Sequence, residues 1–469
     1  MSLARRAVWP EARGLPHLGW WALLALALAL LLTLGGIPAA AALALLIVQR
    51  ARPFDFLTSC LIVVMWGSVI DYTTGQLTLE MSLLSIALVY MVFCYVLWQR
   101  ADLLSFPSTP ITRPMLLYQG LTLINFARGL MAGNSARYAG LELIAAWAIG
   151  CCLLVCNLRM QRAAIATALA WLCATGFVHA GLGLHSYAAF HGRRGDNSFE
   201  PVSGMVAALL LNFALRESRP RRVVLWLALM LPCVLHQLLS FTRGYWIALI
   251  SSTLFSVLVF SARGPGSGER WRRSALVVAG LGGLVAASGA IGALTFNISE
   301  LWQTVGTRFA SSTGTEYSYA TQSNVWRLVE LANALRHIHE SPWFGKGLGY
   351  TILFTEPIFW SLHSEWFIHE NYLLVWLKQG LVGLALFVWL LISAVRTGLK
   401  GRNLPDRWQA SWCAGTAAVT FHLMIYSLVH FPLAEVNSCF ALALMWGGAM
   451  AMTARETTVI RWRRQAPSS

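Results

Sequence analysis

The sequence predicts an all-α, polytopic integral membrane protein, and three observations support this fold class. Of the 469 residues, 57% are hydrophobic and only 12% are charged, whereas a soluble domain carries roughly 25% charged residues. Apolar runs long enough for a helix to cross a bilayer recur along the chain. Basic residues gather in every second loop between these runs, as expected for alternating cytoplasmic loops.

Fourteen apolar runs are candidate membrane-spanning helices. One run is short and another contains Arg128, so we expect about 12 spans, within a range of 12 to 14. The runs lie at about 18–34, 36–49, 54–70, 79–98, 115–131, 138–156, 163–183, 201–215, 223–240, 245–261, 274–294, 371–395, 408–430 and 433–453. The predicted parts are N-terminal transmembrane helices over 1–294, a periplasmic loop domain over 295–368, C-terminal transmembrane helices over 369–455, and a cytoplasmic tail over 456–469.

The distribution of basic residues predicts the orientation of these spans. An even number of spans puts both termini on one side, and with both in the cytoplasm, 25 of the 35 Lys and Arg residues fall in cytoplasmic segments. The net charge of +15 is therefore mainly a topology signal, and we expect no nucleic acid partner. Ten basic residues lie outside or within the membrane: Arg128, Arg137, Arg193, Arg194, Arg243, Arg308, Arg327, Arg336, Lys346 and Lys378.

These ten exceptions suggest an anionic ligand at the outer face of the membrane, because arginine binds phosphate through two parallel hydrogen bonds and keeps its charge. The alternative is that they are scattered salt-bridge or snorkelling residues. We favour that alternative for Arg137, Arg336 and Lys378. Arg128 lies within an apolar run, and the others fall in three outer segments, at 185–201, 240–246 and 296–368.

The third outer segment is the longest and predicts a small helical extracytoplasmic domain. Its stretch 309–324 is rich in Ser, Thr, Tyr and Gly and is typical of a mobile loop. Residues 325–340 have apolar side chains at helical spacing and predict an amphipathic helix. A Pro- and Gly-containing turn at 341–350 ends this helix.

His369 lies at the mouth of the apolar helix predicted from about residue 371. Histidine titrates near neutral pH and is suited to act as a base, although an interfacial histidine in an aromatic belt has the same local sequence. The extracytoplasmic carboxylates have no metal-ligand spacing, and the nine cysteines lie in or beside apolar runs without a disulfide or metal pattern. We therefore expect no metal and no cofactor.

Four sequence patterns carry a resemblance to a known family. His369 and Glu370 precede nine residues and then Gly380-x-x-Gly383, while Ser240-x-x-Arg243-Gly244 opens a span. Arg327 stands fifteen residues before Pro342-x-x-Gly345-x-Gly347. An earlier loop holds Arg193, Arg194, Gly195 and Pro201. In this order, over about residues 185–390, the chain resembles the O-antigen ligase and polymerase superfamily of bacterial envelopes, and its O-antigen ligases most of all. Glu370 departs from the Asn, Ser or Gln usual there.

The resemblance implies a GT-C-like glycosyltransferase that moves a glycan from undecaprenyl diphosphate to a sugar hydroxyl of lipid A–core. The reaction would take place at the periplasmic face of the inner membrane, with inversion and without metal. Because the leaving diphosphate gains negative charge, guanidinium groups aimed at it would stabilise the transition state. We expect Arg243 and Arg327 in that role with His369 as the base, and we expect substrate binding by a set of supporting residues: Arg193, Arg194, Arg308 and Lys346.

Two other functions fit the sequence less well. An O-antigen polymerase, or a protein O-oligosaccharyltransferase of the same superfamily, would share the chemistry and differ in the acceptor. A lipid-linked glycan flippase or transporter would have charges spread through its spans and an internal repeat. Here the exceptional basic residues gather on one face, which favours an enzyme whose partners are the lipid-linked donor, the lipid A–core acceptor and the surrounding membrane lipids.

Overall fold

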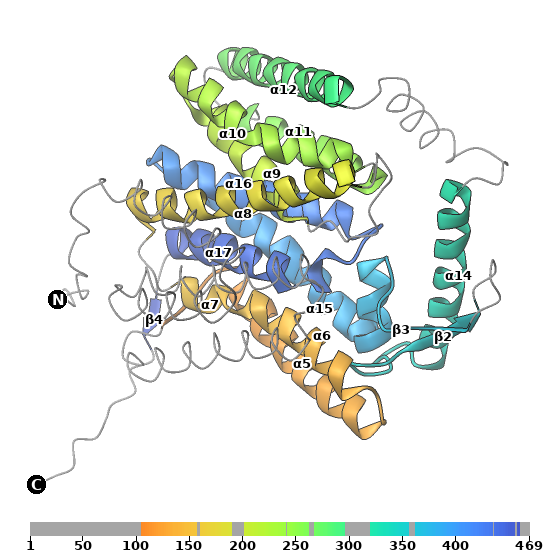
Figure 1. The fold of residues 1–469 in the computed structure, drawn as a ribbon. Coiled ribbons are helices and arrows are strands. Elements are labelled where there is room, and N and C mark those ends of the chain that lie inside the picture. The colour runs from red at the N-terminus through yellow and green to blue at the C-terminus, as the bar shows by residue number, and fades with distance from the viewer. Residues whose placement is uncertain are drawn as a thin grey trace, which may run out of the picture. The chain divides into compact units, whose positions relative to one another are not determined.

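The structure is a computed structural model and is mostly helical (Figure 1). It describes residues 105–156, 160–189, 201–240, 242–261, 267–295, 319–355, 362–434, 436–454 and 457–459, all within one compact unit, Val64–Ser469. The four apolar runs before residue 99 lie outside the described residues, as do Arg193, Arg194 and Arg308.

Every apolar run predicted within the described residues forms a helix. The helices are α5 (Thr112–Met131), α6 (Ala136–Gly150), α7 (Cys152–Val155), α8 (Arg162–Ala189), α9 (Val202–Arg216), α10 (Pro220–Leu239), α11 (Arg243–Ser261), α12 (Ser267–Thr295), α14 (Tyr319–Glu340), α15 (Asn371–Gly401), α16 (Arg407–Tyr426) and α17 (Val436–Thr453). The strands are β1 (Ser105–Pro107), β2 (Ile352–Thr355), β3 (Leu362–Glu365) and β4 (Thr457–Val459). They form two short antiparallel pairs, β1 with β4 and β2 with β3, which the sequence analysis did not anticipate.

Three helices in the described part of the chain are long and apolar enough to cross a membrane: Pro220–Leu238, Arg243–Ser261 and Asn371–Gly401. Shorter apolar helices cover Arg162–Phe177, Val202–Arg216 and Ser438–Thr453. The chain is thus a helical membrane protein. Its number of spans and a GT-C-like architecture remain predictions.

Helix α9 is the centre of the helical core. Every residue from Val202 to Leu215 is buried, which is the pattern of a helix enclosed by other helices rather than one with a single apolar face. Helices α8, α10, α11 and α16 pack against it. Polar side chains in this core form hydrogen bonds, for example Asn212 Nδ2 to Ser256 Oγ at 3.0 Å, as buried polar groups usually do.

The amphipathic helix predicted at 325–340 is confirmed as part of α14, which begins earlier, at Tyr319. Its buried positions Ala334 and Ile338 are four residues apart and lie on one face. They pack against Ile368 before α15 and against two α15 residues, Leu374 and Leu377. This apolar contact sets the part of α14 around Glu330 beside the start of α15.

Helix α15 is interrupted at Gly380, whose φ of 72° and ψ of −175° are not helical. The turn after α14 fills the break, since Lys346 N–H and Gly347 N–H donate to the carbonyls of Leu377 and Lys378, at 2.8 and 2.9 Å. In return, Leu381 N–H donates to Pro342 O at 2.8 Å. The two glycine patterns of the sequence are therefore two halves of one structural unit, the break in α15 and the turn that satisfies its backbone.

Candidate functional site

His369 is held by a buried carboxylate from another helix. Its Nδ1 lies 2.8 Å from Glu330 Oε2 and 3.1 Å from Glu330 Oε1, and its backbone N–H donates to Glu330 Oε2 at 3.4 Å. The Glu330 side chain is 2% exposed, whereas that of His369 is 28% exposed. The histidine therefore has one side bound inside the protein and part of its surface open to solvent.

The carboxylate decides which ring nitrogen of His369 carries the proton. An ionised carboxylate only accepts hydrogen bonds, so Nδ1 is the protonated nitrogen and donates to Glu330. This leaves Nε2 with a lone pair that can accept a proton. A histidine oriented by a carboxylate in this way is the usual arrangement for a general base, and the carboxylate also stabilises the imidazolium that forms.

Glu330 was not predicted as a site residue, because in the sequence it is one of several carboxylates without metal-ligand spacing. The sequence does contain a signal for it, because Glu330, Ala334 and Ile338 recur at four-residue intervals on the apolar face of α14. A carboxylate on the buried face of an amphipathic helix requires a partner. What the sequence could not supply is the identity of that partner, 39 residues further along the chain.

Arg327 lies on α14 one turn before Glu330 and is half-buried. Its charge is within electrostatic range of Glu370, the residue that caps the start of α15. Burial raises the pKa of the Glu370 carboxyl, the negative charge of Glu330 raises it further, and Arg327 and His369 partly oppose these effects. The structure thus brings Arg327 and His369, two of the three predicted catalytic residues, into one charged group with two carboxylates.

Arg243 is the first residue of α11, and a series of ring contacts, two stacked and one edge-on, connects its helix to His369. Tyr245 stacks on Tyr426 with ring centres 4.5 Å apart, and Tyr426 stacks on His430 at 4.9 Å. The His430 ring is 6.4 Å from that of His369. The start of α11 and the mouth of α15 therefore border the same turn, the one that follows α16.

Gly244 explains why this approach of α11 is possible. A Cβ at Gly244 would lie 2.4 Å from Val429 Cγ2, a distance that real contacts do not show. The glycine after Arg243 in the Ser-x-x-Arg-Gly pattern therefore permits close packing on the turn after α16. The pattern combines a charge with the small residue that positions it.

Residues 227–388 match the family model described as O-antigen ligase. This match supports the O-antigen ligase and polymerase superfamily for that part of the chain. No curated protein matches the chain. The resemblance inferred from the sequence motifs is confirmed for this domain, which contains Arg243, Arg327, Glu330 and His369. The superfamily comprises glycosyltransferase-like ligases and polymerases whose lipid-linked glycan donors and lipid acceptors lie in a membrane.

Lys346, predicted as a substrate-binding residue, belongs to the turn that fills the break in α15 of the O-antigen ligase domain. Its Nζ lies 2.5 Å from Glu340 Oε2 at the end of α14 and 5.8 Å from the centre of the Tyr350 ring. Lys346 Nζ donates this hydrogen bond to the Glu340 carboxylate and thereby lowers the pKa of Glu340. The side chain is thus engaged within the domain, and its role in substrate binding remains a prediction.

Two other exceptional basic residues, Lys378 and Arg128, form contacts around the break in α15. Lys378 Nζ lies 2.6 Å from Glu142 Oε1, and both side chains are less than 8% exposed. The salt-bridge alternative favoured for Lys378 is therefore confirmed. Arg128 Nη1 donates to Phe344 O at 2.7 Å and its Nη2 to Gly345 O at 3.3 Å. Both residues hold the turn of the α15 break against α5 and α6.

Within the described ranges, no group of three or more His, Cys, Asp or Glu side chains is arranged to hold a metal ion. Glu330, the carboxylate that contacts His369, already binds its Nδ1 and backbone N–H. Metal independence remains a prediction about the reaction.

Proposed function

We propose that the protein is an O-antigen ligase. It would transfer O-antigen polysaccharide from undecaprenyl diphosphate to a sugar hydroxyl of lipid A–core, with inversion and without metal. The observation that carries the proposal is the pair of His369 and Glu330 inside the matched domain, because a carboxylate-oriented histidine is suited to take a proton from a hydroxyl group. The donor is a lipid and the acceptor is anchored in a lipid, which fits a site beside the mouth of an apolar helix.

The chemistry assigns a separate task to each residue. His369 Nε2 takes the proton of the acceptor hydroxyl as its oxygen attacks the anomeric carbon of the donor sugar. The bond from that carbon to the diphosphate oxygen breaks, and the electron pair leaves with undecaprenyl diphosphate. Attack from the face opposite the leaving group inverts the anomeric centre. Glu330 stabilises the imidazolium that His369 becomes.

Arg243 and Arg327 are the proposed partners of the leaving diphosphate. A guanidinium group keeps its charge and can bind two phosphate oxygens at once, and a well-placed donor typically contributes a few kcal/mol to transition-state stabilisation. The proximity of Arg327 to His369 supports this role, since the leaving group and the attacking hydroxyl must meet at one carbon atom. Arg193, Arg194 and Arg308 are proposed as further donor contacts.

Deletion of the gene, followed by electrophoresis of the lipopolysaccharide, tests the proposal against its nearest competitor. Loss of the ligase leaves full-length glycan on the carrier lipid and a bare lipid A–core. Loss of an O-antigen polymerase instead leaves lipid A–core carrying a single repeat unit. The second pattern would mean that the protein is a polymerase and that the site described above acts in the polymerase reaction.

A further inference from the structure

A second charged region lies at the starts of α10 and α16, the ends of these helices that are remote from His369. Helix α16 ends at Tyr426, beside His430, and begins at Arg407. With 20 residues and a rise of about 1.5 Å per residue, its two ends are roughly 30 Å apart, which equals the hydrocarbon thickness of a typical bilayer. Helix α10 likewise runs from Pro220 to Leu239, next to the segment that leads into Arg243. Arg407 and the start of α10 therefore lie at the end of the bundle remote from the candidate active site.

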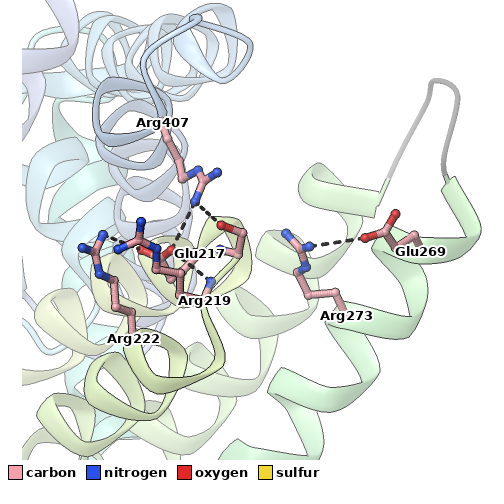
Figure 2. Close-up of polar contacts among 7 residues, drawn as sticks. Glu217, Arg219, Arg222, Glu269, Arg273 and Arg407 are labelled. Atoms are coloured by element: carbon pink, nitrogen blue, oxygen red, sulfur yellow. Dashed lines mark hydrogen bonds and ion pairs between the residues drawn. The ribbon is translucent and has the colours of Figure 1, made fainter.

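Glu217 is the centre of this region, at the corner between α9 and α10 (Figure 2). Its side chain is 7% exposed. Its Oε1 accepts hydrogen bonds from Arg407 Nη1 at 3.1 Å and from the backbone N–H groups of Ser218 and Arg219 at 2.9 and 3.2 Å. Its Oε2 lies 3.9 Å from Arg222 Nη1.

The arginines around Glu217 exceed its charge. Figure 2 shows Arg219, Arg222 and Arg407 around one carboxylate, so the group has two positive charges in excess. Arg222 and Arg407 have side chains that are 43% and 50% exposed. Both bonds that Arg407 makes, to Glu217 and to Ser218 Oγ, use Nη1, so the other edge of its guanidinium faces outward. The backbone N–H groups of Ser218 and Arg219, just before α10, donate to Glu217. The excess positive charge is therefore carried by the arginine guanidinium groups.

An aromatic cluster marks the depth of these arginines relative to a bilayer. Trp408 follows Arg407, and its ring packs edge-on against Trp226 and Phe213, with ring centres 5.9 and 5.5 Å apart. Arg162 lies over Trp408 at 5.0 Å. Tryptophan concentrates where hydrocarbon meets headgroups. The exposed guanidinium groups beside Trp408 are thus at the level of lipid phosphates.

We propose that Arg222 and Arg407 bind the phosphate of an anionic membrane phospholipid at the α9–α10 corner. The two guanidinium groups supply bidentate donors to the phosphate oxygens, and the partly exposed Trp408 lies beside the upper acyl chains. Glu217 neutralises only one of the three arginine charges around it. This site is separate from the transfer reaction and does not depend on the identity of the glycan.

Lipid titration of the purified full-length chain in detergent tests the proposal. The probe is phosphatidylglycerol, compared with zwitterionic phosphatidylethanolamine and with inorganic phosphate, and the readouts are binding by native mass spectrometry and the thermal unfolding midpoint. Phosphatidylglycerol should bind and raise the midpoint, whereas the other two should have little effect. Arg222→Gln with Arg407→Gln should weaken its binding by roughly fivefold for each arginine lost. Arg273→Gln is the matched control, because Arg273 pairs with an exposed Glu269 on α12 at 3.5 Å and does not contact Glu217.

Glu217→Gln provides a second variant with the opposite expected result. The amide oxygen can still accept the backbone hydrogen bonds, but the competing negative charge is gone, so phosphatidylglycerol should bind more tightly than to the wild type. If the double variant fails to fold, the lipid binding of Glu217→Gln alone tests the proposed site. Equal stabilisation by inorganic phosphate would overturn the lipid assignment. Equal weakening by Arg273→Gln, or weaker binding in Glu217→Gln, would overturn the site itself.

Discussion

Glu330 and His369 act at the residue scale as one unit formed by two elements. Glu330 is inside the protein, accepts from Nδ1 and leaves Nε2 available. The identity of the protonated nitrogen therefore depends on Glu330 being a carboxylate and not merely polar. An amide of the same shape could donate its N–H to Nδ1 and favour the tautomer whose proton is on Nε2, which cannot act as a base.

Glu330→Gln should consequently lose nearly as much transfer activity as removal of the imidazole, about 10²- to 10⁴-fold, although its shape is preserved. Donor binding should change little, because the diphosphate partners are arginines. The measurement is the transfer rate of purified enzyme with donor binding followed separately. Glu340→Gln, at the exposed end of the same helix, is the control. A Glu330→Gln variant with wild-type rate would mean that the tautomer of His369 is set by something else.

Glu370 predicts a pH dependence of stability. Burial and the neighbouring charge of Glu330 raise its pKa above the ordinary value of 4.5, so the folded protein binds its proton more tightly than the unfolded chain. Stability is then lost as pH rises from the ordinary value through the raised one. Glu370→Gln should be more stable than the wild type at neutral pH, and the difference should vanish in acid.

Thermal unfolding midpoints of the two proteins across pH measure this effect. Glu340→Gln is the opposing control, since a hydrogen bond from Lys346 lowers the pKa of Glu340. Its removal should lower stability at neutral pH, not raise it. If Glu370→Gln destabilised the protein at neutral pH, the carboxylate would be a stabilising cap of α15 rather than a buried charge.

At the scale of elements, the break in α15 and the turn that fills it form the framework of the site. Gly380 has a φ of 72°, and a Cβ there would lie 2.1 Å from Trp343 O. Gly380→Ala should therefore lower the free energy of unfolding by at least the 1–3 kcal/mol typical of such backbone strain. It should also reduce activity, because the same turn joins α14 to the start of α15.

Gly120→Ala is the matched control for this prediction. Gly120 is within α5, and a Cβ there would meet nothing within 4 Å, so alanine should be neutral or stabilising by about 0.5–1 kcal/mol. Chemical unfolding of both variants gives the comparison. Equal stability of the two variants would show that the α15 break relaxes without cost.

The sequence predicted elements better than the contacts between them. Apolar runs and the amphipathic pattern predicted the described helices. The change from a polar to an apolar sequence near residue 370 predicted that His369 lies at the mouth of α15. The break at Gly380 was not predicted, because the apolar run passes through it and its backbone is satisfied by residues 31 to 39 positions earlier. The partnership of Glu330 with His369 was missed for the same physical reason, since it depends on how α14 packs.

For the whole molecule, the orientation in the membrane decides whether the candidate site faces the donor. The positive-inside distribution predicts both termini in the cytoplasm and residues 296–368 in the periplasm. Reporter fusions at Gly314 and at the C-terminus should give opposite signals. Equal signals would contradict the assignment of the His369 end to the periplasm and of the Glu217 corner to the cytoplasm.

The central claim is that this chain transfers a lipid-linked glycan to lipid A–core with His369 as its base. The most direct test is the transfer rate of the purified protein with undecaprenyl-diphosphate-linked glycan and lipid A–core, for the wild type and His369→Ala, with donor binding measured in parallel. We expect wild-type transfer without added metal, a loss of about 10²- to 10⁴-fold in His369→Ala, and unchanged donor binding. Lost donor binding with intact turnover of bound donor would instead make His369 a phosphate ligand and contradict the account.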